Sequence, residues 1–409
     1  MPALERCSKS SDATKKGAIE METLNDKGLT MVENYYSDYG YRARALKQAG
    51  KRIMGYISAV APVEIINAAG FMPVRIKGDP KEAVTKAYGN METLVCPFLL
   101  NAFDLALKGK YDYLDGIVIP HTCDSVSRTY EVWKRNFPLP YYHFLNVPHL
   151  DGAPSLEFFT QILKTFIKSL EQFTGKEISK KSLDHSVLAY NELRQAMRDL
   201  YDLRKPDQPL ISGIEMMKLL VAVKALPVDE STALIRQVAK EVKGRKMSSP
   251  QKPLRVMLAG DQIDDTALIE IIEKTGAQVV MDDISVGSKL YYADIEVTHD
   301  PVDGIAKYYL EKVNLPTFYR DKGGSYDENL ELRFGHLKRF ISEFDVDAVI
   351  LLVYKNCDPY GFEVPATTSY IESLGKPVFY VEDEYSSSSS SRLKTRIEAF
   401  LEMLTQKRR

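Results

Sequence analysis

Two short apolar runs, each followed by a cysteine and an aspartate, constrain this sequence more than any other feature. Residues 115–120 (DGIVIP) lead to Cys123, and residues 348–353 (AVILLV) lead to Cys357. Each run has the length and composition of a buried strand, and the polar residues after it are typical of a loop. In open α/β sheets, ligands bind outside the carboxyl ends of strands. The pattern therefore predicts that both thiols lie at the functional edge of a sheet.

Segments with strand and helix patterns alternate in both halves of the chain. Strands are predicted at residues 52–57, 71–76, 116–120, 141–147, 254–259, 278–282, 346–354 and 377–381. Helical patterns lie between them. Residues 62–70, for example, begin with a proline and end with a glycine, which suits the first turn and the end of a helix. This alternation predicts an α/β fold with two doubly wound parallel sheets of the flavodoxin or Rossmann kind.

Changes in composition and in hydrophobic periodicity divide the 409 residues into four predicted parts. These are an N-terminal lead-in with helices (1–50), a first α/β domain (51–150), a helical connector (151–250) and a second α/β domain (251–409). The first 27 residues are polar and patternless, so we expect a mobile lead-in, and the helical pattern after it is interrupted near Gly40. In the connector, apolar residues at helical spacing predict packing and no chemistry.

Composition excludes several classes of protein. The formal net charge is −2, so no basic field for nucleic acid is expected. The sequence has no apolar stretch of about 18 residues, which predicts no membrane span. Its first residues contain no apolar h-region, so no signal peptide is expected. We therefore expect a cytoplasmic protein. Its four cysteines are not a disulfide framework in a chain this long, so the thiols are expected to be reduced.

Three of these cysteines, Cys96, Cys123 and Cys357, are candidate metal ligands, whereas Cys7 lies in the polar lead-in and is expected to have no role. Zinc-ribbon and ferredoxin spacings are absent. The hypothesis of an iron–sulfur cluster therefore depends on the polar loops around Cys123 and Cys357. Three protein ligands would leave one cluster position open to a substrate oxygen.

Nucleophilic catalysis by Cys123 is an open alternative, because His121 lies two residues away and would share a face with it in an extended stretch. This alternative leaves Cys96 and Cys357 without a role. The sequence contains neither GxGxxG nor GxxxxGK[ST]. We therefore expect this chain neither to bind a dinucleotide nor to hydrolyse ATP.

Many segments, in one order, resemble the 2-hydroxyacyl-CoA dehydratase and benzoyl-CoA reductase family, in the iron–sulfur subunits of those enzymes. The resemblance covers nearly all of residues 30–409. Its segments include EIINAAGFMPVRI (64–76), VCPF around Cys96, YDYLDGIVIPHTCDSVSRTYEVW (111–133), AGDQIDDTALIEIIEKTGAQVVMDDISVGSK (259–289) and KNCDPYGFEVP (355–365). The serine run 386–391 departs from the family's usual mixture of Thr or Ser, Gly and Gln.

The resemblance implies a [4Fe–4S] cluster held by Cys96, Cys123 and Cys357. It also implies an acyl-CoA substrate, a second homologous subunit, and a separate ATP-hydrolysing iron–sulfur activator that injects one electron. In the dehydratases that electron makes a ketyl radical from the thioester, and the 2-hydroxyl group leaves with help from cluster iron. In the reductases an aromatic acyl-CoA is reduced. We expect a dehydratase first and a reductase second, with an electron-transfer or scaffold subunit and a metal-free binding protein as further alternatives.

Three other residues are candidates beside the cysteines. Glu64 follows a strand and Pro62, in the first turn of a helix. It is either a partner of the helix dipole or an acid or base near the acyl-CoA, where an enclosed site would raise its pKa. His121 and Asp124 flank Cys123 and are expected to orient it or to hydrogen-bond to cluster sulfur.

Overall fold

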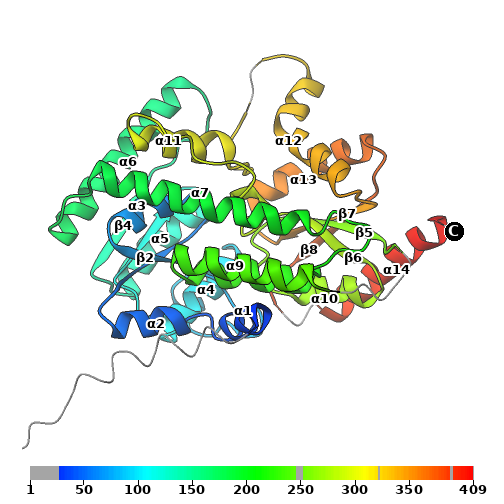
Figure 1. The fold of residues 1–409 in the computed structure, drawn as a ribbon, viewed down its shortest axis with the longest axis horizontal. Coiled ribbons are helices and arrows are strands. Elements are labelled where there is room, and N and C mark those ends of the chain that lie inside the picture. The colour runs from blue at the N-terminus through cyan, green and yellow to red at the C-terminus, as the bar shows by residue number, and fades with distance from the viewer. Residues whose placement is uncertain (1–26, 246–251, 321–322, 387–389, 409) are drawn as a thin grey trace, which may run out of the picture.

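Two four-stranded parallel sheets organise the computed structural model, which describes residues 27–245, 252–320, 323–386 and 390–408 (Figure 1). Cys7 lies outside the described residues, as do most of the predicted linker around residue 250 and residues 387–389 of the serine run. In the described part of the chain, no helix combines the length and the apolar character needed to cross a membrane.

The two sheets have the same topology, which confirms the predicted doubly wound fold. The first sheet has the order β2-β1-β3-β4 and the second the order β6-β5-β7-β8, with all pairs parallel. The strands are β1 (Arg52–Tyr56), β2 (Phe71–Arg75), β3 (Gly116–Pro120), β4 (Tyr141–Leu145), β5 (Arg255–Gly260), β6 (Gln278–Asp283), β7 (Ala348–Tyr354) and β8 (Val378–Asp383). Strands such as β3 and β7 are buried along their whole length because helices cover both faces of a parallel sheet.

In both sheets, the strand order reverses between the first and third strands of the unit. These strands are β1 and β3 in the first sheet and β5 and β7 in the second. At such a point the loops that follow the two strands turn to opposite faces and leave a crevice at the carboxyl ends. The fold therefore has two equivalent crevices, one in each α/β unit.

The helices lie where the sequence pattern predicts them, with one exception. The helices are α1 (Gly28–Ser37), α2 (Tyr41–Gln48), α3 (Val63–Ala68), α4 (Pro97–Leu107), α5 (Asp124–Asn136), α6 (Ala153–Thr174), α7 (Lys180–Asp202), α8 (Gly213–Ala222), α9 (Val228–Lys243), α10 (Ala267–Lys274), α11 (Pro301–Lys307), α12 (Tyr326–Glu343), α13 (Asp358–Ser373) and α14 (Ser390–Arg408). The predicted break near Gly40 separates α1 from α2. The exception is the irregular stretch between β6 and α12, which contains α11, the 3-10 helix η3 (Ser288–Leu290) and the π-helix η4 (Tyr308–Lys312).

The two units and the connector pack into one molecule. Figure 1 shows α7 and α9 of the connector running side by side along both sheets. One apolar core contains Ile53 and Ile117 of the first sheet together with Val256 and Ile350 of the second. The two units share this core, and the predicted domain boundaries stay a prediction.

Gly260, the last residue of β5, allows β7 to approach closely. Its φ is +131°, and a Cβ built there would lie 1.8 Å from the carbonyl oxygen of Leu352. We therefore expect Gly260→Ala to lower the free energy of unfolding by at least about 2 kcal/mol, measured by urea unfolding. Gly276→Ala is the control: its φ is +89° but no atom lies within 4 Å of the added Cβ. The control substitution should lower the free energy of unfolding by about 1 kcal/mol. Equal losses of stability in the two variants would contradict the steric explanation.

Candidate functional site

Cys96, Cys123 and Cys357 line a single cavity between the two α/β units, here called the thiol cavity. Its walls include the apolar side chains Ile57, Phe98 and Leu99 from the first unit and Leu315 from the second. The crevices of the two sheets therefore face each other, which brings the thiols of residues far apart in the chain to one place. The binding of a cluster by these thiols stays a prediction.

Each of the three cysteines immediately precedes a helix. Cys96 is the N-cap of α4, Cys123 of α5 and Cys357 of α13. Prolines in the first turns of α4 and α13 favour a helix start at these positions, because a first-turn residue needs no backbone N–H. Backbone amides in the first turn of each helix hydrogen-bond to the sulfur. Three partial positive charges thus point at the cavity, an arrangement that stabilises an anionic group.

Asp261, which sequence reasoning missed, is a fourth polar group in the thiol cavity. It follows β5 directly, is buried, and is hydrogen-bonded to the thiol of Cys357. Its Oδ2 atom has no hydrogen-bond partner among the described residues. Its signal in the sequence is its place after a strand-like run, which it shares with Cys123 and Cys357, but aspartates are common in such loops.

Two residues of the thiol cavity have a strained backbone. Ser58, after β1, has a φ of +75°, and Asn356, before Cys357, has a φ of +60°. Residues other than glycine rarely adopt this left-handed conformation, and such strain concentrates at functional sites. The strain shows that packing around the cavity imposes these loop conformations.

The electrostatics of the cavity keep the thiols protonated in the metal-free chain. Burial raises the pKa of the Cys96, Cys123 and Cys357 thiols, and the carboxylate of Asp261 raises each of them further. Burial also raises the pKa of Asp261. Metal binding to these sulfurs would therefore displace protons, as it does at thiolate sites in general.

The three thiols have the chemistry of iron–sulfur cluster ligands. Among the described residues, no three His, Cys, Asp or Glu side chains are grouped so that they could hold one metal ion. The three thiols instead surround a shared cavity, and cysteine thiolates are the usual ligands of clusters, whose several irons separate the ligands. The cavity also contains an unpartnered carboxylate oxygen, on Asp261.

The structure does not bring His121 or Asp124 into the wall of the thiol cavity. The ring of His121 lies 4.6 Å from that of His149, centroid to centroid, and burial together with His149 lowers the pKa of His121. In the part of the chain that the structure describes, no hydrogen bond joins His121 to Cys123, so the geometry gives no support to a nucleophilic pair. The supporting roles expected for His121 and Asp124 stay predictions.

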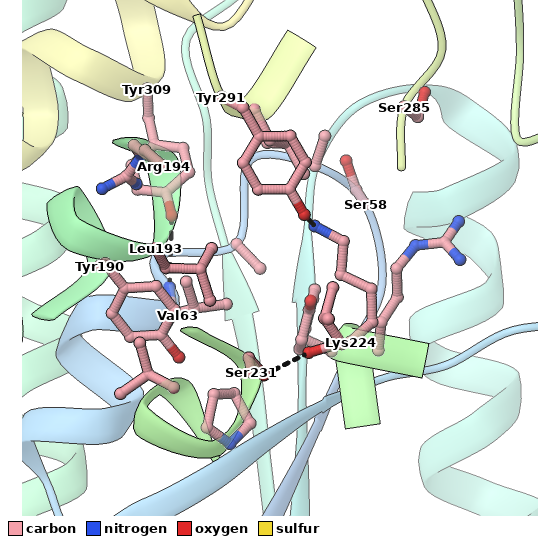
Figure 2. A pocket seen from close by; sticks show the side chains of 18 of the residues that line it. Ser58, Val63, Tyr190, Leu193, Arg194, Lys224, Ser231, Ser285, Tyr291 and Tyr309 are labelled. Carbon is pink, nitrogen blue, oxygen red and sulfur yellow. Dashed lines mark hydrogen bonds between the residues drawn. The ribbon is translucent and has the colours of Figure 1, made fainter. Parts of the chain in front are cut away.

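Glu64 lies behind a second cavity, which adjoins the first. This second cavity is called the tyrosine pocket because Tyr56, Tyr190, Tyr291, Tyr308 and Tyr309 line it (Figure 2).

The carboxylate of Glu64 is fully buried, and both of its oxygens are engaged. One oxygen forms an ion pair with Arg194, and the other accepts a hydrogen bond from Tyr309 at 2.8 Å. Ser58 and Ser285 line both cavities, so the two spaces meet there. The acid or base role of Glu64 stays a prediction, and its observed interaction is a buried ion pair.

Because of this ion pair, we expect substitutions of two arginines on α7 to differ strongly in their effect on the free energy of unfolding. Arg194→Met leaves Glu64 charged and buried without its partner, which should lower the free energy of unfolding by about 3–5 kcal/mol in urea unfolding. Adding Glu64→Gln should restore most of the loss. Arg198→Met is the matched control, since its ion pair with Asp294 lies at the surface and is expected to contribute about 1 kcal/mol or less. A similar loss from both arginines would refute the buried pair.

Comparison with known proteins identifies the family. Residues 58–404 match the family model described as 2-hydroxyglutaryl-CoA dehydratase, D-component. The chain is 26% identical to the (R)-phenyllactyl-CoA dehydratase beta subunit of Clostridium sporogenes, over 89% of this chain and 95% of that protein. It is 23% identical to lactoyl-CoA dehydratase subunit beta of Anaerotignum propionicum, over 87% and 93%.

A third relative comes from a reductase. The chain is 24% identical to one of the subunits of benzoyl-CoA reductase from Thauera aromatica, over 88% of this chain and 93% of that protein. The family match includes Cys96, Cys123 and Cys357 and confirms the resemblance found in the sequence. The chain therefore belongs to the 2-hydroxyglutaryl-CoA dehydratase D-component family.

Proposed function

We propose that this chain is the [4Fe–4S] subunit of a 2-hydroxyacyl-CoA dehydratase. This lyase would remove water from a 2-hydroxyacyl-CoA through a ketyl radical, after activation by one electron. The observation that carries the proposal is the meeting of Cys96, Cys123 and Cys357 at one cavity, in a family whose members include dehydratase subunits.

Cys96, Cys123 and Cys357 would hold the cluster. When bound, it supplies one-electron chemistry and an iron position open to a substrate oxygen. The chain itself contributes the surroundings. The N-termini of α4, α5 and α13 offset negative charge on the sulfurs, and the apolar wall around Phe98 and Leu99 excludes water, which strengthens these electrostatic interactions.

The proposed reaction needs partners. We propose a second, homologous subunit and a separate ATP-dependent iron–sulfur activator, in the cytoplasm. The names of the relatives support a multi-subunit enzyme, since two are beta subunits of dehydratases and the third is one of the subunits of a reductase. Glu64 is proposed as an acid or base near the acyl-CoA, and His121 and Asp124 as supports of Cys123.

Reduction of an aromatic acyl-CoA is the second candidate, because the reductase relative matches about as well as the dehydratase relatives. The two reactions are separated by an anaerobic assay of the reconstituted complex with lactoyl-, phenyllactoyl- and benzoyl-CoA. We expect water loss from a 2-hydroxyacyl-CoA. Consumption of benzoyl-CoA alone would exclude the dehydratase, whereas full turnover by Glu64→Gln would favour a purely electron-transferring subunit.

Cluster binding is tested by iron content. Cys357→Ser removes one of the three sulfurs in the thiol cavity, so we expect the anaerobically purified variant to lose most of its iron and acid-labile sulfide per chain. Cys7→Ser is the matched control and should retain the parent content, since Cys7 lies outside the family match. Equal iron in the two variants, or a parent chain without iron, would contradict the proposal.

A further inference from the structure

The tyrosine pocket contains a buried lysine amine that forms no salt bridge with a carboxylate of the described residues. Lys224, on the short turn η2 (Val223–Ala225), lines this pocket and donates a hydrogen bond to the Tyr291 hydroxyl at 2.7 Å. Figure 2 shows the two side chains meeting inside the pocket. Among the described residues, Lys224 forms no ion pair with any carboxylate. A buried ammonium is costly unless it is paired, so this amine would hold its proton best with an anionic ligand beside it.

The charges around Lys224 reinforce this preference. Burial lowers the pKa of Lys224 well below its usual value, the charges of Arg75 and Arg194 lower it further, and the carboxylate of Glu64 raises it. Each arginine already has its own carboxylate, with Arg75 bonded to Asp264 and Arg194 to Glu64. Three cationic side chains thus face two carboxylates when Lys224 is protonated. One added negative charge would balance the pocket.

The pocket also offers neutral donors. The hydroxyl of Tyr190 lines the pocket opposite Lys224 and has no hydrogen-bond partner among the described residues (Figure 2). Burial raises its pKa well above the usual value, so it stays a neutral donor. Apolar side chains, including Leu193, Val223 and Leu226, form much of the remaining wall. The ligand that fits these walls has one anionic end and a small carbon body.

We propose that the tyrosine pocket binds a short-chain carboxylate, with the carboxylate at the Lys224 ammonium. The positions open to the centre of a water molecule occupy about 60 Å³. That space corresponds to about four to six waters, and hence to a similar number of non-hydrogen atoms. Because Ser58 and Ser285 line both cavities, the carbon chain can extend toward the thiol cavity. The inference concerns binding and does not depend on the proposed dehydration.

Calorimetric titration of the anaerobically purified full chain with butyrate tests this proposal, with butyramide as the uncharged control. We expect butyrate to bind and butyramide to bind at least about tenfold more weakly, since it cannot form the charge-assisted bond. Lys224→Met should weaken butyrate binding by about 10- to 100-fold. Lys218→Met is the matched control, because Lys218 lies on the adjoining helix α8 and pairs with Glu33 outside the pocket. This variant should bind butyrate with the same affinity as the parent chain.

Tyr190→Phe gives a second readout should Lys224→Met fold poorly. This variant should weaken butyrate binding several-fold without lowering the thermal midpoint, because the lost hydroxyl has no partner in the described protein. The proposal is overturned if butyrate does not bind, if butyrate and butyramide bind alike, or if Lys224→Met and Tyr190→Phe both bind butyrate as tightly as the parent.

The source of the carboxylate is distinguished by two thioesters, succinyl-CoA and butyryl-CoA. If the acyl chain carries the carboxylate, Lys224→Met should weaken the binding of succinyl-CoA and leave the binding of butyryl-CoA unchanged. If the carboxylate is a free acid, only butyrate should respond to the substitution. If the binding of all three ligands is insensitive to Lys224→Met, the proposed pocket is refuted. If Lys224 binds the ligand but the reconstituted complex shows no dehydratase activity, only the proposed function is refuted.

Discussion

The buried ion pair between Arg75 and Asp264 joins the two α/β units and shapes both cavities. Its atoms lie 3.2 Å apart, and the side chains are 3% and 0% exposed. Arg75 ends β2 and lines the tyrosine pocket, and its guanidinium lies 5.6 Å from the ring centre of Phe98 in the wall of the thiol cavity. Because an unpaired charge in such a place is strongly destabilising, the pair holds the loop after β5 in one position relative to β2.

Duplication of one topology explains why chemistry gathers between the units. Each sheet has its own crevice at the carboxyl ends of its central strands, and the two crevices face one another. Neither unit alone could surround a ligand with three sulfurs, since the first contributes Cys96 and Cys123 and the second Cys357. The same enclosure excludes water, raises the pKa of the thiols and makes the helix N-termini around them effective.

The residues that sequence reasoning missed share a physical cause. Asp261 follows a strand, as Cys123 and Cys357 do, but a single aspartate in a loop is too common to be noticed without its burial. Lys224 belongs to a region whose apolar periodicity predicts packing, and only the bend at η2 directs it into a pocket. The ring of His121 packs against that of His149, and its expected role beside Cys123 stays a prediction.

Local pattern determined the strands, most of the helices and the place of Cys123 and Cys357 at strand ends, because apolar periodicity and helix-boundary residues act over a few neighbours. The many segments in family order also determined the family. Only the tertiary structure decided that three distant thiols and Asp261 share a cavity, that Glu64 pairs with Arg194, and that Lys224 lines a pocket without a salt bridge to any carboxylate of the described residues. These facts depend on how the two units pack, and no local sequence pattern specifies contacts between residues a hundred or more positions apart.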